Sequence, residues 1–484
     1  MLSPHKTRIV ATIGPASDDV GVLEAMIRAG LNVARLNFSH GRFEEHAARI
    51  GRLRAAAAAA GREIALLADL PGPKMRIGRL AAEPIELLKG QSFTLTTDEI
   101  VGDETRVSVS FASLPQAVKP GDRLLLNDGL VQILVRQVSG PEVRCEVQVG
   151  GELRSRKGLN LPGIDLGISA FTDHDRECLA FALQHGVDIV SQSFVESAAD
   201  IRAVRQAARE LGHEPFVIAK VERAGALERI DEILDEADGI MVARGDLGVE
   251  VPVERIAVLQ KDLVRRALIR GRPVITATQM LESMTHSRQP TRAEATDVAN
   301  AILDGTDAVM LSGESAVGDH PVEAVATLAR IAAATEPYRP RFDLWDRLRS
   351  LSPDANLDVR DLMSLGIEAV TEVSKPAAVV VPTRTGTTAR RISRFRLPIW
   401  VAAPGTDPQV CRRLLLSYGV EPIYVGERPA DWNAFARDWV RKEGLTGRLA
   451  ILATGPSMHD PAAATRMDLL ELQASRSDQE REGR

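Results

Sequence analysis

Short apolar runs alternate with segments of helical spacing through residues 1–340, apart from one interruption. Eight of the runs have the length and the continuous apolar character of buried parallel strands. A helical segment follows almost every one of them, which is the order of a strand–helix repeat. The predicted strands begin at residues 7, 32, 64, 188, 216, 239, 273 and 307. Eight such units predict an α/β fold, a (β/α)₈ TIM barrel.

The interruption lies between the third and fourth predicted strands. Residues 72–162 are rich in Gly, Thr and Val, and turn signals such as Lys119-Pro-Gly-Asp122 and Asn127-Asp-Gly129 separate short alternating runs. This pattern is typical of a small all-β domain. We therefore expect a β domain, residues 71–163, inserted into a barrel that comprises residues 1–70 and 164–340.

A second α/β unit is expected after the barrel. Residues 337–358 contain three prolines without a clear period, which predicts a linker. The C-terminal domain would span residues 341–473, and the polar residues 474–484 predict a disordered tail. Its strands are predicted at residues 377–381, 398–402, 420–425 and 449–453, with helices between them.

Charged residues gather where the fifth and sixth predicted strands end. Lys220 and Glu222 are two residues apart, so on a strand their side chains lie on the same side. Asp246 follows the next strand and, if the two strands are parallel neighbours, converges with Glu222 at one end of the barrel. Two carboxylates without nearby His or Cys favour a hard cation, Mg²⁺ or Mn²⁺, and the ammonium favours an anion beside it. The alternative is an ion pair on the strand rim and a helix-capping Asp246.

The second predicted strand carries a polar face. Arg35, Asn37 and Ser39 alternate with other residues, which places them on one face of the strand, and the third strand ends in Asp69. Polar groups in a buried parallel strand are costly unless they bind something. These residues therefore add to the candidate site at the strand ends.

The composition bears on the class of function. The chain has 484 residues, and its net charge of −6 argues against nucleic acid as a partner. No apolar stretch approaches the ~18 residues of a membrane span, and the first residues run into a strand pattern, so no signal peptide is expected. Cys145, Cys178 and Cys411 have no metal-binding spacing, which predicts reduced thiols and a cytoplasmic location.

Over almost its whole length the sequence resembles the pyruvate kinase family. The matching runs are residues 7–17, 32–41, 156–163, 218–222, 239–250, 273–284, 290–315 and 318–322. The resemblance implies an allosteric, Mg²⁺-dependent glycolytic enzyme that transfers the phosphoryl group of phosphoenolpyruvate to ADP, giving pyruvate and ATP. It also implies that the insertion is a β-barrel lid, that the C-terminal domain is regulatory and that the assembly is a homotetramer.

The resemblance also implies roles for single residues. Glu222 and Asp246 match the divalent-metal ligands, and Lys220 matches the lysine that stabilises the phosphoryl group in flight and the enolate. The remaining matches are Arg35 on the phosphoryl group, the amides of Gly245 and Asp246 with Thr278 on the substrate carboxylate, and Thr278, Ser312 and Glu314 along the proton route to the enolate. The nucleotide-binding positions are His40, Arg76, Asp128 and Lys157. For Ser193 and Phe194, at the barrel rim, we expect a packing role.

One departure from the family concerns the monovalent cation. Many relatives need K⁺ and read Asp-Thr-Lys-Gly-Pro-Glu after the third strand, whereas this chain reads Asp69-Leu70-Pro71-Gly72-Pro73-Lys74. Asn37, Ser39 and Asp69 are retained as ion ligands, but Lys74 stands in place of Glu. A tethered ammonium would supply the charge of K⁺, so we predict a K⁺-independent enzyme. The alternative is that Lys74 points to solvent and K⁺ still binds.

Two further segments differ from relatives. Arg223-Ala-Gly225 replaces the more usual Asn-Pro-Glu, with no expected loss of chemistry. In the C-terminal domain, a Thr- and Gly-rich strand-to-helix turn offers hydroxyls and amides to a phosphate, and the resemblance makes it the effector loop. This loop comprises Thr383, Arg384, Thr385, Gly386, Thr387 and Thr388. Residues 454–459 lack the Gly- and Trp-containing loop of fructose-bisphosphate-activated relatives, so AMP or a sugar monophosphate is the expected effector.

Other functions fit the sequence less well. A metal-dependent lyase acting on a pyruvate enolate would need neither the lid nor His40, Arg76 and Lys157. A non-catalytic sensor of phosphorylated metabolites should have lost at least one of Lys220, Glu222, Asp246 and Thr278. A dinucleotide-dependent oxidoreductase is disfavoured because no Gly-x-Gly-x-x-Gly turn follows the first strand, and a Walker-type phosphate loop is absent.

Overall fold

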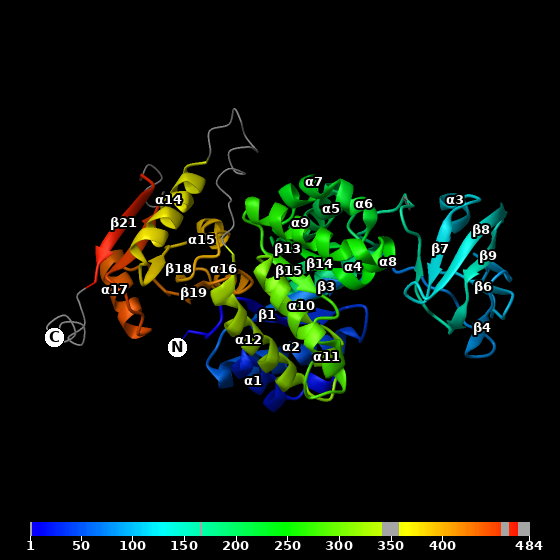
Figure 1. Cartoon of the computed structure of the whole chain (residues 1–484), viewed down its shortest axis with the longest axis horizontal. Coiled ribbons are helices and arrows are strands. Elements are labelled where there is room, and N and C mark those ends of the chain that lie inside the picture. The colour runs from blue at the N-terminus through cyan, green and yellow to red at the C-terminus, as the bar shows by residue number, and fades with distance from the viewer. Residues whose placement is uncertain (1, 165–166, 341–357, 456–463, 473–484) are drawn as a thin grey trace.

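The computed structural model describes residues 2–164, 167–340, 358–455 and 464–472. The barrel lies in the middle of an elongated molecule, with the inserted domain at one end and the C-terminal domain at the other (Figure 1). The barrel strands are β1 (Arg8–Thr12), β2 (Val33–Asn37), β3 (Ala65–Leu70), β12 (Ile189–Gln192), β13 (Phe216–Val221), β14 (Gly239–Ala243), β15 (Val274–Ala277) and β16 (Ala308–Leu311). They close in the order β1-β16-β15-β14-β13-β12-β3-β2, and each begins within one residue of its predicted start.

Helices and short helical turns connect the barrel strands. Local chemistry sets their ends: the Asp19 carboxylate accepts hydrogen bonds from Gly21 N and Val22 N at the first helix, and Gly61 ends the second in a left-handed conformation. The helical elements are η1 (Pro15–Ser17), α1 (Val20–Ala29), α2 (Phe43–Ala60), α4 (Asp173–Gln184), α5 (Ala198–Glu210), α6 (Ala224–Glu228), α7 (Ile230–Glu236), α8 (Arg244–Glu250), η2 (Val253–Arg255), α9 (Ile256–Ile269), η3 (Glu282–Thr285), α10 (Arg292–Leu303), α11 (Gly313–Ala316), α12 (Pro321–Thr335) and η4 (Glu336–Tyr338). In the described part of the chain, every helix is too short or too polar to cross a lipid bilayer.

The barrel interior is a packed apolar core. Side chains such as Val10, Ile218, Met241 and Ile275 fill it, and Leu415 and Leu416 of the C-terminal domain belong to the same buried cluster. The C-terminal domain also attaches through ion pairs, Arg412 with Asp188 at 2.7 Å and Arg396 with Asp307. Since Asp188 and Asp307 precede β12 and β16, the domain covers the amino ends of the strands and leaves the carboxyl ends for the site.

The insertion is an all-β domain with one short helix, α3 (Leu114–Ala117). Its strands are β4 (Ile85–Leu87), β5 (Ser92–Thr96), β6 (Arg106–Ser108), β7 (Arg123–Leu126), β8 (Val131–Ser139), β9 (Glu142–Val149), β10 (Gly151–Leu153) and β11 (Leu159–Asn160). They form a six-stranded sheet, β11-β7-β8-β9-β5-β6, and a two-stranded sheet, β10-β4, around a core of their own. The predicted turn between β7 and β8 is present, with Asn127, Asp128 and Gly129 all at positive φ.

The C-terminal domain is the predicted second α/β unit. Its strands are β17 (Ala378–Val380), β18 (Trp400–Gly405), β19 (Val420–Tyr424), β20 (Leu449–Thr454) and β21 (Arg466–Glu471), and its helices are α14 (Val359–Ser374), α15 (Thr387–Ser393), α16 (Pro408–Leu414) and α17 (Trp432–Lys442). The sheet order is β19-β18-β17-β20-β21. Strand β21, antiparallel to β20, was not predicted; it is largely exposed, and Leu470 is its one buried residue. The tail at 474–484 and most of the linker lie outside the described residues.

Candidate active site

Lys220 lies at the centre of a buried charged network near the carboxyl ends of the barrel strands. Its Nζ lies 2.8 Å from Glu222 Oε1, 3.3 Å from Asp69 and 2.6 Å from Ser193 Oγ. Lys220 and Glu222 are therefore on the same side of the chain, as their spacing predicted. Ser193, for which we expected only a packing role, is a direct hydrogen-bond partner of the ammonium.

Asp69 joins this network to Arg35. The carboxylate accepts a hydrogen bond from Arg35 Nε at 2.9 Å and one from Ser191 Oγ at 2.6 Å, while Arg35 Nη1 donates to Thr12 Oγ1 at 2.8 Å. Burial alone would raise the pKa of Asp69, but the Lys220 and Arg35 charges outweigh it and lower this pKa to about 2. The carboxylate is therefore ionised and fixes two cations at the mouth of the barrel.

Glu222 is buried directly after β13. Its Oε2 accepts a hydrogen bond from the Phe194 backbone N–H at 2.8 Å, and Phe194 has a φ of 57°. Burial raises the pKa of Glu222, the Lys220 charge opposes this, and the Asp246 charge adds to it. A cation bound between Glu222 and Asp246 would compensate the repulsion of these two negative charges.

Asp246 is exposed in the first turn of α8, which follows β14, the neighbour of β13. The preceding residue, Gly245, donates its backbone N–H to Thr278 Oγ1 at 2.7 Å, and Thr278 Oγ1 donates to Ala277 O at 2.6 Å. The Gly245 amide, expected to face a substrate carboxylate, is thus engaged by Thr278. Thr278 has a φ of 68°, a strained conformation for a β-branched residue and one that recurs at functional sites.

Glu314 connects two loops at the rim. It is fully buried, and its two carboxylate oxygens accept hydrogen bonds from Leu281 N at 3.1 Å and Ser312 N at 2.7 Å. Ser312 precedes α11 and is half-buried. Glu314 thus supports the segments that carry Thr278 and Ser312, which the sequence had placed with it on a proton route.

The predicted nucleotide residues come from the barrel rim and the inserted domain. His40 is exposed after β2, and its pKa is lowered by desolvation and by the charges of Lys74 and Arg76. Arg76 pairs through its backbone with Gly158, beside Lys157, and Asp128 Oδ1 lies 3.7 Å from where a Cβ on Gly158 would be. The Lys74 and Arg76 charges act on His40, so the base of the inserted domain lies within electrostatic range of this part of the barrel rim.

The residues expected at the monovalent-cation site gather around Asp69. Asn37 Oδ1 accepts a hydrogen bond from Ser39 N at 3.1 Å, and Leu70 is buried at the end of β3. Lys74 is exposed, and its pKa is lowered by desolvation and by the Lys220 charge, while Asp69 and Glu222 oppose the shift. The Lys74 ammonium is therefore within electrostatic range of the charged network.

The carboxylates fit a hard divalent ion. Among the described residues, no group of three or more His, Cys, Asp and Glu side chains is arranged to hold a metal. Glu222 and Asp246 provide two carboxylates, and Mg²⁺ commonly takes one or two protein carboxylates and completes its shell with water and substrate oxygens. The donor set therefore suits Mg²⁺ bound together with an anionic substrate.

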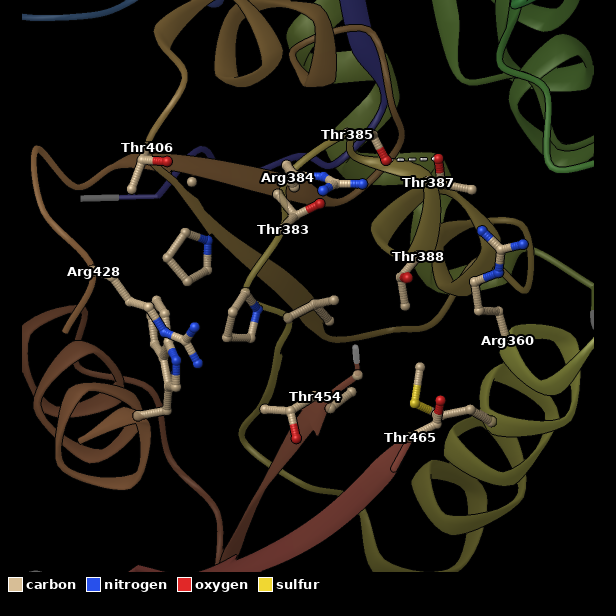
Figure 2. Close-up of a pocket in the computed structure, with 18 of the residues that line it drawn as sticks. Arg360, Thr383, Arg384, Thr385, Thr387, Thr388, Thr406, Arg428, Thr454 and Thr465 are labelled. Carbon is tan, nitrogen blue, oxygen red and sulfur yellow. Dashed lines mark hydrogen bonds between the residues drawn. The ribbon is translucent and has the colours of Figure 1, made fainter. Parts of the chain in front are cut away.

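The C-terminal domain contains a separate cavity of about 700 Å³. Figure 2 shows threonine and arginine side chains around it, with a hydrogen bond of 3.0 Å between Thr385 and Thr387. Five of the six predicted effector-loop residues, all except Gly386, line this threonine-rich cavity, and Thr383 Oγ1 accepts the Gly386 N–H at 2.8 Å. Sequence reasoning missed two further arginines in the lining, Arg360 and Arg428, which come from segments distant from the loop.

The closed barrel, with buried carboxylates and cations at its carboxyl end, has the architecture of a TIM-barrel enzyme for an anionic substrate. The barrel-domain model of the pyruvate kinase family matches residues 4–325, and the family's alpha/beta-domain model matches residues 362–464. The chain belongs to the pyruvate kinase family and is a phosphotransferase; the family generally uses Mg²⁺.

Individual relatives agree over nearly the full length. The chain is 47% identical to the pyruvate kinase of Thermococcus litoralis, over 88% of this chain and 90% of the relative. It is 40% identical to the pyruvate kinase of Thermotoga maritima, over 93% and 96%. The crystal structure of a pyruvate kinase from Cryptosporidium parvum is similar, with a TM-score of 0.89 and 34% identity over 97% of this chain and 96% of that one.

Proposed function

We propose that the charged network at the barrel mouth carries out phosphoryl transfer from phosphoenolpyruvate to ADP. The observation that carries this proposal is the convergence of Lys220, Arg35 and Glu222 on one buried site, held together by Asp69. Phosphoryl transfer needs little covalent help from a protein and depends on positioning and charge neutralisation. Two fixed cations beside two carboxylates supply both.

Each protein group has a defined task in this proposal. Arg35 and Lys220 bind the phosphoryl oxygens, and Lys220 also stabilises the enolate oxygen that remains after transfer. Glu222 and Asp246 would hold the divalent ion, which when bound neutralises phosphoryl and carboxylate charge. His40, Arg76, Asp128 and Lys157 bind the nucleotide at the opening of the inserted domain, which we therefore call the lid.

The enolate must then be protonated at carbon. We assign to Thr278 the last hydroxyl on the proton route to the enolate, with Ser312 and water preceding it on that route. Because both Glu314 oxygens accept backbone amides, its role is to position these loops rather than to deliver the proton itself. The Thr278 hydroxyl is bonded to Ala277 O, so it must turn away from that carbonyl to reach the substrate.

The assay is pyruvate formation from phosphoenolpyruvate and ADP with Mg²⁺. Replacing Lys220 by Gln removes the cation nearest the reacting group, and activity is expected to fall by roughly 10³-fold. Arg123→Gln, an exposed change on β7 of the lid, is the control and should leave the rate unchanged. Full activity of Lys220→Gln would contradict the assignment.

We further propose that the enzyme does not need K⁺. The support is the position of the Lys74 ammonium within electrostatic range of Asp69 and Glu222, where it brings the positive charge that K⁺ would otherwise supply. The rate with Mg²⁺ should be the same whether the accompanying salt is K⁺ or a bulky organic cation. Loss of most activity without K⁺ would overturn this part of the proposal and leave the enzyme assignment intact.

The threonine-rich cavity is proposed to bind a phosphorylated effector, with AMP or a sugar monophosphate as the candidate. Arg360, Arg384 and Arg428 provide charge, and the threonine hydroxyls provide hydrogen bonds to a phosphate. The half-saturating phosphoenolpyruvate concentration should shift with such ligands, and Arg384→Gln should abolish the shift. The control is Arg437→Gln, an exposed change on α17 outside the cavity. No shift across a panel of these ligands would count against effector binding.

Assembly, location and domain limits are also proposals. Family membership supports a homotetramer in the cytoplasm. The proposed domain limits are residues 1–70 with 164–340, 71–163 and 341–473. The support for them is that β3 ends at Leu70 and that α14 begins at Val359, within the third domain. Sedimentation of the purified enzyme tests the tetramer directly.

A further inference from the structure

A second cavity, of about 350 Å³, lies between the barrel and the C-terminal domain. On the barrel side it is lined by the end of α5 and the segment that enters β13, and on the other side by α15, α16 and part of the effector loop. We call it the interdomain cavity. It is distinct from the threonine-rich cavity, although Thr385 and Thr387 contribute to both.

The lining of the interdomain cavity has an excess of positive charge. Four arginines, Arg205, Arg209, Arg390 and Arg413, and two carboxylates, Glu214 and Asp238, contribute to it. Of the two carboxylates, Asp238 already has partners within the protein. It forms an ion pair with Arg205 at 2.8 Å and accepts the Val217 backbone N–H at 2.9 Å. Glu214 is exposed, so it compensates little of the charge within the cavity.

Three of the arginines lack an ion-pair partner among the described residues: Arg209, Arg390 and Arg413. Arg390 donates to Thr385 O at 2.8 Å, and its guanidinium lies 5.2 Å from the centre of the Phe216 ring. Arg413 donates to Glu214 O at 2.8 Å and to Asp188 O at 3.2 Å. These contacts orient the two guanidiniums. Carboxylates such as Asp238 act on both charges electrostatically, but none forms an ion pair with them among the described residues.

Desolvation makes this arrangement expensive without an anion. Burial lowers the pKa of Arg390 to about 10, and the charges of Arg272 and Arg413 act in the same direction, against Asp238. A guanidinium that is removed from water and surrounded by others of like sign is stabilised when an anion enters. The planar donors of arginine match the oxygens of a phosphate group.

We propose that the interdomain cavity is a binding site for a small phosphorylated molecule. Arg209, Arg390 and Arg413 take the phosphate. The cavity is larger than a single phosphate ion needs and is lined largely by polar groups, among them the hydroxyls of Thr385 and Thr387, so the rest of the ligand is polar.

The ligand would bridge two domains. The barrel wall of the interdomain cavity leads directly into β13, which carries Lys220, and the opposite wall belongs to α15 and α16. A ligand that contacts both walls binds only while the domains are docked. It therefore stabilises the docked arrangement by a free energy that grows with the logarithm of one plus its concentration over its Kd. The threonines serve both cavities, so the arginines are the residues that separate the two sites experimentally.

Inorganic phosphate is the probe, and the full-length enzyme is the sample. Arg209→Ser is the main variant, because the Arg209 side chain is exposed and forms no ion pair among the described residues. Arg123→Ser on the lid is the matched control, and Arg384→Ser reports on the threonine-rich cavity alone. Calorimetric titration is run with phosphoenolpyruvate and Mg²⁺ present to occupy the active site.

Arg209→Ser is expected to weaken one phosphate-binding component about tenfold, whereas Arg384→Ser and Arg123→Ser leave that component unchanged. Phosphate in crystals of the enzyme should lie about 3 Å from the Arg390 or Arg413 guanidinium. Equal affinities in Arg209→Ser and Arg123→Ser, or phosphate found only in other sites, would overturn the proposal. Pyruvate formation by Arg209→Ser without phosphate should equal that of the unaltered enzyme, so a failure of this site is distinguishable from a failure of the catalytic assignment.

Discussion

The Arg244 guanidinium donates to the backbone carbonyl of Thr278 across 2.7 Å. It also forms an ion pair with Asp297 of α10 at 2.7 Å, and Arg244 Nε donates to Ala277 O. One side chain at the start of α8 thus holds the strained turn after β15. Because Gly245 N bonds Thr278 Oγ1, the two segments expected to bind the substrate carboxylate are fixed relative to each other.

Arg244→Gln should therefore lower kcat/KM for phosphoenolpyruvate by about 10²-fold, since a displacement of about 1 Å in a positioning group has that effect. Asp297→Asn keeps Arg244 and its carbonyl bonds, so a smaller loss is expected. Steady-state kinetics in phosphoenolpyruvate and in ADP tests this. A loss confined to the KM for ADP would show that Arg244 does not position the phosphoenolpyruvate side.

The role of Lys74 gives a reciprocal prediction. Lys74→Glu replaces the ammonium by a carboxylate and so adds negative charge near Asp69 and Glu222. Activity without K⁺ should fall at least about tenfold, and K⁺ should restore most of it, because the ion supplies the missing charge. Rates are compared at equal ionic strength in K⁺ and in a bulky organic cation. Lys89→Glu, an exposed change elsewhere on the lid, is the control and should show no K⁺ effect.

Sequence patterns predicted the barrel well, because a buried parallel strand is a local property of five or six apolar residues. The spacing of Lys220 and Glu222 gave their common direction for the same reason. Arg244 escaped notice because its function depends on carbonyl groups at Ala277 and Thr278, and a backbone carbonyl has no sequence signature. Ser193 was misjudged likewise, since only the folded barrel brings its hydroxyl to Lys220.

The interdomain cavity could not have been predicted either. Arg209, Arg390 and Arg413 are far apart in the sequence, and each taken alone resembles a solvated surface charge. Their common environment follows from how the C-terminal domain docks on the barrel. That docking depends on long-range contacts such as Arg412 with Asp188, which composition and periodicity do not encode.

Asp69 makes stability depend on pH in a predictable direction. Its folded pKa is about 2, below the value of about 3.9 for an unfolded chain. The stabilisation is therefore complete above pH ~4 and is lost as the pH falls from about 4 toward 2, with a total of about 3 kcal/mol. Asp69→Asn removes this titration, so the difference in thermal midpoint between the two proteins should shrink as the pH falls from 5 to 3. A difference that stays constant over this range would show that Asp69 does not contribute in this way.

Arg396 is expected to hold the C-terminal domain on the barrel. Arg396 is buried, donates to Gly305 O at 2.9 Å and 2.7 Å, and forms an ion pair with Asp307. The Asp307 carboxylate also accepts hydrogen bonds from Val274 N and Tyr418 N. Arg396→Met leaves the buried Asp307 carboxylate without its counter-charge, and such a loss costs about 3 kcal/mol or more. The variant should unfold at a lower temperature and be cleaved faster by protease between the domains, whereas exposed Arg437→Met should do neither. Because the carboxyl end of the barrel is distant from this contact, kcat at low temperature should change little. If the domain junction stays intact in Arg396→Met, the apolar contacts of Leu415 and Leu416 are enough to hold the C-terminal domain on the barrel.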